Sequence, residues 1–122
     1  MKAIFLGTNG WYDTSTGNTI CTLLQTDRYD ILLDAGNGIH RVEGHVGGEK
    51  PVFLFLSHFH IDHVEGVAAA RRATSAPIWL HRADQQLYEA VPVQAQWFGV
   101  QVEALPAVDH QSTVCLTLRR AQ

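Results

Sequence analysis

Short apolar runs recur along the first part of the chain, and turn-forming residues separate them. Residues 2–7 are expected to form a buried strand that ends at the Gly-Thr-Asn-Gly turn. Residues 18–26 and 29–35 flank a tight turn, which predicts a hairpin. The segment 36–51 carries five glycines, so we expect a loop with a short helix near residues 39–43.

The pattern changes in the middle of the chain. Residues 52–56 are all apolar, which predicts a strand covered on both faces. Residues 64–73 are expected to form a helix, ended by Pro77 because proline disfavours helical backbone in the preceding residue. Residues 77–81 then form the next strand, which completes a strand–helix–strand unit.

The remaining segments continue an α/β pattern. Residues 82–91 are expected to be helical, with an apolar stripe at Ala83, Leu87 and Val91. Residues 100–106 and 112–120 alternate with period two and are expected to be strands.

Composition bounds the size and class of the protein. A chain of 122 residues fits one domain, residues 1–122, and 46% hydrophobic residues suffice for a packed core. A net charge of -3 and a pI near 6.1 give no general attraction to nucleic acid or anionic membranes. These totals do not exclude a local basic patch. No apolar run reaches the roughly 18 residues of a spanning helix, and the first residues lack a signal-peptide pattern. We therefore expect a cytoplasmic protein that does not bind membranes.

Two cysteines lie in strand-like segments. Cys21 and Cys115 are expected to be buried free thiols, with a disulfide between them as the alternative.

A cluster of titratable residues follows the all-apolar strand. His58, His60, Asp62 and His63 fall within six residues, at a strand end where ligand sites commonly form. In an extended loop His58 and His60 project to the same side and reach one metal ion. Asp62 and His63 diverge and are placed to hold a second ion. Such ligands suit zinc, with manganese or iron as alternatives.

The alternative is that these are ordinary surface or core histidines. Clustering favours the metal interpretation, because burying several imidazoles and a carboxylate together without a cation is costly.

The segment SHFHIDHVEG resembles the His-x-His-x-Asp-His signature of the metallo-β-lactamase superfamily. The preceding segment, MKAIFLGTNG to NTICTLLQTDRYDILLDAGNG, is similar to the ribonuclease Z and cyclic-nucleotide phosphodiesterase branch. In that branch a Gly-Thr-Gly turn follows the first strand and an Asp-x-Gly turn ends a later one. Here Asn9 replaces a glycine that is common in the branch.

The resemblance implies a set of metal ligands. His58 and His60 would bind the first ion, and His110 would complete its three histidines. Asp62 and His63 would bind the second ion, and Asp62 is also the candidate catalytic residue.

Other polar residues have weaker assignments. Asp34 matches a family aspartate that orients a ligand or water from outside the coordination shell, with a turn-supporting role as the alternative. His110 has the alternative of an ordinary turn histidine. His40, His45 and His81 are expected not to bind metal.

The resemblance also implies that the chain corresponds to the N-terminal half of an αββα sandwich. The family's bridging aspartate and last histidine have no candidate here, since the position of Asp109 does not match. Half a sandwich would leave unpaired strand edges and an uncovered apolar face. We therefore expect a homodimer, a partner chain that supplies the missing half, or a fragment of a longer product.

The implied reaction is hydrolysis by a metal-bound hydroxide, since such ions lower the pKa of bound water to about 7. In the resembling branch the substrate is a phosphodiester in RNA or in a cyclic nucleotide. Lactams, lactones and thioesters are substrates elsewhere in the superfamily. A non-enzymatic or inactive metal-binding half domain is the alternative from another class. Trp11 and Tyr12 either line the cleft or cap the core.

Overall fold

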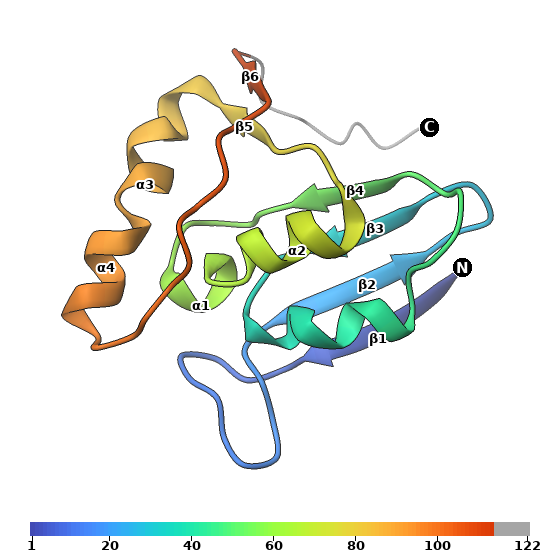
Figure 1. Ribbon diagram of the computed structural model, residues 1–122, viewed down its shortest axis with the longest axis horizontal. Coiled ribbons are helices and arrows are strands. Elements are labelled where there is room, and N and C mark those ends of the chain that lie inside the picture. Colours follow the sequence, from blue (N-terminus) through green and yellow to red (C-terminus); the bar gives the residue numbers. More distant parts are fainter. Residues whose placement is uncertain (114–122) are drawn as a thin grey trace, which may run out of the picture.

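The computed structural model describes residues 1–113 and shows a mixed sheet with helices on one face (Figure 1). Four strands lie in the order β1-β2-β3-β4. They are β1 (Lys2–Gly7), β2 (Cys21–Gln25), β3 (Asp30–Leu33) and β4 (Val52–Phe55). The first three are antiparallel neighbours and β4 runs parallel to β3, so the predicted strands and hairpin are confirmed. The expectation that the first strand is buried is wrong, because Lys2, Ala3 and Phe5 are exposed.

Three helical segments cover one face of this sheet. They are the 3-10 helix η1 (Asn37–Gly44), which includes the short helix expected near residues 39–43, and α1 (Ile61–Val64) and α2 (Val67–Thr74). Helix α2 ends at Ser75, whose left-handed φ of 56° stops it two residues before Pro77. The predicted helix is confirmed, while the residue that ends it differs.

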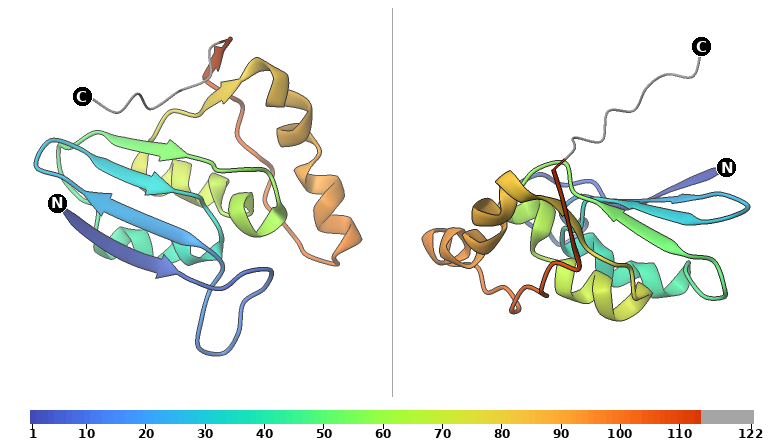
Figure 2. Two further views of the ribbon diagram at one scale, coloured as in Figure 1. Left: turned by 180° about the vertical axis from the view of Figure 1, so that it is seen from behind. Right: turned by 90° about the horizontal axis from the view of Figure 1, so that it is seen from above.

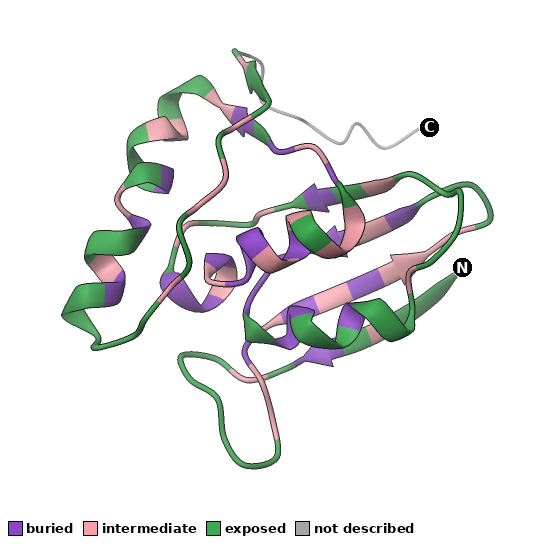
Figure 3. Ribbon diagram, viewed as in Figure 1, coloured by how far each residue is buried: buried purple, intermediate pink, exposed green. Residues whose placement is uncertain are grey.

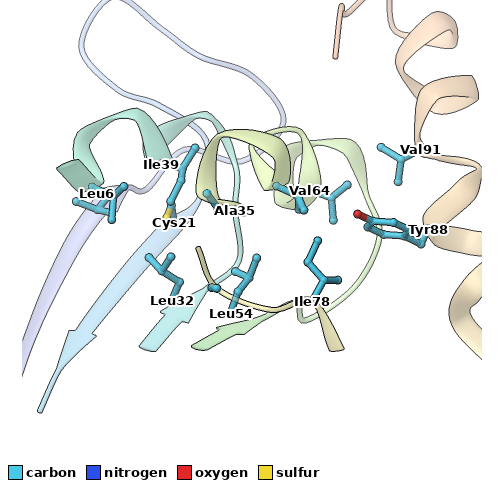
Figure 4. Close-up of a cluster of buried hydrophobic side chains, with 14 of the residues drawn as sticks. Leu6, Cys21, Leu32, Ala35, Ile39, Leu54, Val64, Ile78, Tyr88 and Val91 are labelled. Atoms are coloured by element: carbon cyan, nitrogen blue, oxygen red, sulfur yellow. The ribbon is translucent and has the colours of Figure 1, made fainter. Parts of the chain in front are cut away.

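The core lies between the sheet and these helices (Figure 4). Leu32 and Leu54 contribute from the strands, and Ile39, Val64 and Ile78 belong to the same cluster. Burying one such side chain contributes about 1.5–3 kcal/mol, which makes this single layer of contacts the main source of stability.

The opposite face of the sheet is uncovered among the described residues (Figure 2). Buried segments of the strands and of the covering helices are purple in Figure 3. Phe5, Phe53 and Phe55 are exposed there, whereas Leu54 is buried. The expectation that residues 52–56 are covered on both faces is therefore wrong for the described chain. Alternate side chains of a strand point to opposite faces, and no described element packs on this one. The uncovered apolar face agrees with the expectation for half a sandwich, and a dimer or partner chain stays a prediction.

A second group of elements follows α2. Strands β5 (Trp79–His81) and β6 (His110–Ser112) pair with each other in parallel. Strand β5 is the strand expected at residues 77–81, but it pairs with β6 and not with β4, so the expected strand–helix–strand unit does not form one sheet. The pairing partner is remote in sequence, which is why the local pattern misassigned it.

The helices between these strands are shorter than expected. They are the 3-10 helix η2 (Arg82–Asp84), α3 (Gln85–Glu89) and α4 (Val91–Trp97). The predicted stripe is wrong, because Tyr88, Val91 and Ala95 are buried while Leu87 is 53% exposed. The breaks between η2, α3 and α4 change which side chains share a face.

Two further expectations have separate outcomes. Residues 100–106 form no strand, although Val102 and Leu105 pack against the core. Residues 114–120 of the last expected strand, with Cys115, lie outside the described residues. Cys21 is a buried free thiol, and burial raises its pKa to about 12. Within residues 1–113, no helix is long and apolar enough to cross a bilayer.

Gly66 allows close contact between α2 and the turn after β3. A Cβ at this position would lie 2.5 Å from Ile39 Cγ2 and 2.6 Å from the Gly36 carbonyl oxygen. We expect Gly66→Ala to lower the free energy of unfolding by about 1–3 kcal/mol, because a crowded backbone contact cannot relax cheaply. Urea denaturation measures this loss. Gly10→Ala is the control, since a Cβ there meets no atom within 4 Å, and equal losses in both variants would contradict the explanation.

Candidate metal centre

The segment 57–63, here called the histidine loop, comprises the loop after β4 and the first three residues of α1. His60 is the N-cap of α1 with extended backbone, and its side chain makes no capping hydrogen bond. The imidazole centroids of His58 and His60 lie 4.7 Å apart, and those of His58 and His63 lie 3.9 Å apart. The three rings that the sequence predicts as ligands are therefore brought together.

Asp34 joins this loop to the end of β3. Its backbone has a left-handed φ of 59°, a conformation in which aspartate is tolerated better than most residues. The carboxylate accepts hydrogen bonds from Ser57 N at 2.7 Å and Ser57 Oγ at 2.9 Å. Its Oδ2 also lies 3.0 Å from His63 Nδ1. The carboxylate is thus held at the parallel ends of β3 and β4 and orients one ring of the cluster.

Asp62 carries an unpaired buried oxygen. The residue is 5% exposed, and among the described residues its Oδ1 has no hydrogen-bond partner. Its Oδ2 lies 3.3 Å from His63 Nε2. A buried carboxylate oxygen without a donor is unfavourable unless a cation or another donor satisfies it. Imidazoles beside this carboxylate form a donor set that fits a divalent metal ion.

Ring nitrogens of His58 and His63 contact neighbouring protein groups. His58 Nδ1 lies 2.9 Å from Ser57 Oγ, and His63 uses both nitrogens with Asp34 and Asp62. Within residues 1–113, no three His, Cys, Asp or Glu side chains are placed to hold one ion as they stand. Metal binding would therefore require these side chains to reorient.

The pKa of His58 is lowered mainly by burial, with the neighbouring His63 and His60 adding to the effect. A lowered pKa favours the neutral imidazole, which is the form that binds metals.

His110 lies in β6, and the structure does not place it with the other histidines. Its ring stacks on Trp79 with a centroid distance of 4.1 Å. The preceding Asp109 is paired with Arg71 and accepts a hydrogen bond from Ile78 N at 2.7 Å. Arg71 and this hydrogen bond lower the pKa of Asp109 to about 2. Metal binding by His110 stays a prediction.

The remaining histidines make local contacts. His81 Nδ1 accepts from Ala83 N at the start of η2, and His40 Nδ1 lies 2.6 Å from Asn37 O. His45 is exposed. The contacts of His40 and His81 are those of turn and cap residues. That these three histidines do not bind metal stays a prediction.

Sequence reasoning missed a polar network beside the histidine loop. Glu65 accepts hydrogen bonds from Thr19 Oγ1 and Asn37 N. Asp13 accepts from Thr19 N at 2.8 Å and from the Asn37 side chain. Burial raises the pKa of Glu65. The network fixes the loop between β1 and β2 against Asn37 at the start of η1 and Glu65 at the end of α1. No local pattern signals these long-range pairs.

Residues 15–111 match the sequence model of the Metallo-beta-lactamase superfamily. The chain belongs to this superfamily. Its members are metal-dependent, which agrees with the donor set found here. The predicted fold class and the resemblance to the superfamily are thereby confirmed.

Relatives of this chain include the probable metallo-hydrolase YhfI of Bacillus subtilis, 25% identical over 112 residues, 82% of this chain. The chain spans 46% of that relative's length. The crystal structure of YhfI matches with a TM-score of 0.61 at 26% identity, covering 71% of this chain and 39% of that one.

A further relative and a further solved structure match parts of the chain. Ribonuclease Z of Haloarcula marismortui is 37% identical over 68 residues, 55% of this chain and 22% of the relative. The structure of TTHA1623 in a di-iron-bound form matches with a TM-score of 0.60 at 24% identity, covering 82% of this chain and 51% of that one. At 24% identity, the match to TTHA1623 shows a shared fold and no shared function.

Proposed function

We propose that this protein is a metal-dependent hydrolase of phosphodiester bonds. The observation that carries the proposal is the unpaired buried Oδ1 of Asp62 beside the rings of His58, His60 and His63. His58, His60 and His110 would hold a first ion, and Asp62 and His63 a second. Binding by His110 would require its ring to leave Trp79. Zinc suits the donor set best, and iron or manganese are the alternatives.

The chain's own groups orient the ligands. Hydrogen bonds from Ser57 fix the Asp34 carboxylate. Asp34 Oδ2 in turn lies 3.0 Å from His63 Nδ1 and orients that ring. With Nδ1 held by Asp34, Nε2 is the nitrogen that would coordinate the metal, since a carboxylate partner fixes both tautomer and ring direction. Its present contact with Asp62 Oδ2 would give way to the metal. When bound, the metal supplies a nucleophile at neutral pH and stabilises negative charge on the reacting group.

The phosphodiester assignment is supported by the ribonuclease Z relative. A direct test is hydrolysis of bis(p-nitrophenyl) phosphate by metal-free protein reloaded separately with zinc, manganese or iron. The expected result is turnover that requires metal and is lost in His58→Ala.

p-Nitrophenyl acetate and a thioester are tested alongside the phosphodiester. Turnover of either of these with none of the phosphodiester would overturn the substrate class. Metal binding without turnover of any substrate would favour a non-enzymatic metal-binding role.

A further inference from the structure

His60 differs from its neighbours in the histidine loop, because its ring has no polar partner among the described residues. His58 Nδ1 lies 2.9 Å from Ser57 Oγ, and both ring nitrogens of His63 contact carboxylates. His60 makes ring contacts instead, with His58 and with Trp11. Its side chain is exposed and caps no helix N–H. No hydrogen bond within the described chain therefore fixes the direction of this imidazole.

Trp11 supplies this constraint through a stacked contact. The indole and imidazole centroids lie 5.6 Å apart, with the two planes at 27°. The separation falls within the roughly 4.5–7 Å of attractive ring pairs. The indole also contacts the ring of Phe98, with centroids 5.6 Å apart. Trp11 is 58% exposed, so burial in the core does not explain its position.

The loop between β1 and β2 holds Trp11 in this place. The side chain of Asn9 donates hydrogen bonds to Tyr12 O at 3.3 Å and to Thr14 Oγ1 at 3.2 Å. These two bonds close the loop around residue 11. A glycine, which is common at position 9 in the resembling branch, has no side chain to make them. The anchoring of Trp11 therefore depends on a residue in which this chain departs from that branch.

Trp11 and Tyr12 are neighbours with different surroundings. Trp11 lines an apolar hollow of about 680 Å³ beside the histidine loop, together with Trp97 and Phe98 of the α4 region. Tyr12 is 73% exposed and lies outside this hollow. Of the two residues expected to line the cleft or cap the core, only Trp11 lines the hollow, and Tyr12 does neither. Tyr12 is therefore a matched control for Trp11.

We infer that Trp11 is a positioning residue that holds the imidazole of His60 in one direction for metal binding. The inference rests on the proposed function for the metal, whereas the ring contact depends only on the stack. Since neither ring nitrogen of His60 contacts a described protein group, His60 can bind an ion without losing a hydrogen bond. The reorientation that metal binding requires then falls on His58 and His63, around a His60 ring that is already fixed.

The ring contact is tested in metal-free protein by nuclear magnetic resonance. The ring current of the indole should shift the imidazole protons of His60 upfield. This shift should be lost in Trp11→Leu, which keeps an apolar side chain without a ring, and largely kept in Trp11→Phe. Tyr12→Ala should leave it unchanged. Identical His60 proton shifts in Trp11→Leu and in the unsubstituted protein would overturn the inference.

Zinc affinity tests the positioning itself, by competition with a chromogenic chelator. Trp11→Leu should weaken binding about twofold to tenfold, which corresponds to the roughly 0.5–1.5 kcal/mol of an aromatic pair. Trp11→Phe should restore most of the affinity, and Tyr12→Ala should bind as the unsubstituted protein does. Zinc binding that Trp11→Leu leaves unchanged would overturn the inference alone. No zinc binding by the unsubstituted protein would overturn the proposed function, while the proton shifts would still decide the ring contact.

Asn9→Ala tests the same role from the loop. The substitution removes both side-chain hydrogen bonds around residue 11 and touches neither ring. It should weaken zinc binding less than Trp11→Leu does, and add nothing in a protein that already carries Trp11→Leu, because both act through one contact. Urea denaturation checks that the variants are folded. Additive losses from the two substitutions would overturn the inference, since the loop would then affect the site by a route other than Trp11.

Discussion

His60→Ala is expected to lower the metal content of the purified protein to about a tenth or less of the original. Loss of a ligand should exceed the 10–100-fold loss of affinity typical when a residue that supports a ligand is replaced. The side chain of His60 caps no helix N–H, so its removal should leave α1 folded. Elemental analysis of protein purified without chelator or histidine tag measures the effect.

His81→Ala is the matched control for this experiment. His81 accepts a hydrogen bond from Ala83 N, so the variant should lose about 0.5–2 kcal/mol of stability while keeping its metal. Circular dichroism checks that both variants are folded. Equal metal retention by the two folded variants would contradict a metal site at the histidine loop. About two ions per chain in the unsubstituted protein would indicate a dinuclear site, and one ion a mononuclear site.

Asp34→Asn is expected to weaken metal binding about 10–100-fold while the loop keeps its shape. Asparagine tolerates the left-handed backbone of residue 34, so no new strain arises. The neutral amide is a weaker partner for His63 Nδ1 than the carboxylate is, which leaves the ring less well oriented. Competition with a chromogenic zinc chelator measures the affinity.

Asp27→Asn removes one negative charge from the turn between β2 and β3 and serves as the control for net charge. Its metal affinity should equal that of the unsubstituted protein. If Asp34→Asn and Asp27→Asn weaken binding equally, the effect is one of overall charge. If Asp34→Asn binds metal as tightly as the unsubstituted protein, Asp34 only supports the turn.

Strands of the sheet could be predicted where the local sequence contains both an apolar run and the turn-forming residues that end it. Strands β1, β2 and β3 are short apolar runs bounded by glycine, asparagine and aspartate, and adjacent antiparallel strands need little more than a turn to pair. The strand at residues 77–81 was also found, but its partner β6 is far along the chain. Pairing over such a separation leaves no local pattern.

Burial was predicted less well than secondary structure. An all-apolar β4 is compatible with one or two covered faces, and only the packing shows that Phe53 and Phe55 are exposed. The stripe at residues 83, 87 and 91 assumed one continuous helix, whereas the chain forms three short segments. Which face of a short helix is buried depends on what it packs against.

The sequence by itself determined the superfamily signature and the chemistry of its donors, because both reside in a few contiguous residues, 58–63. Only the tertiary structure decided how Asp34 is held against His63, where His110 lies, and that Trp11 and Trp97 line one hollow. These contacts join residues distant along the chain. Their geometry follows from the packing of the sheet, loops and helices as a whole, and no short segment encodes it.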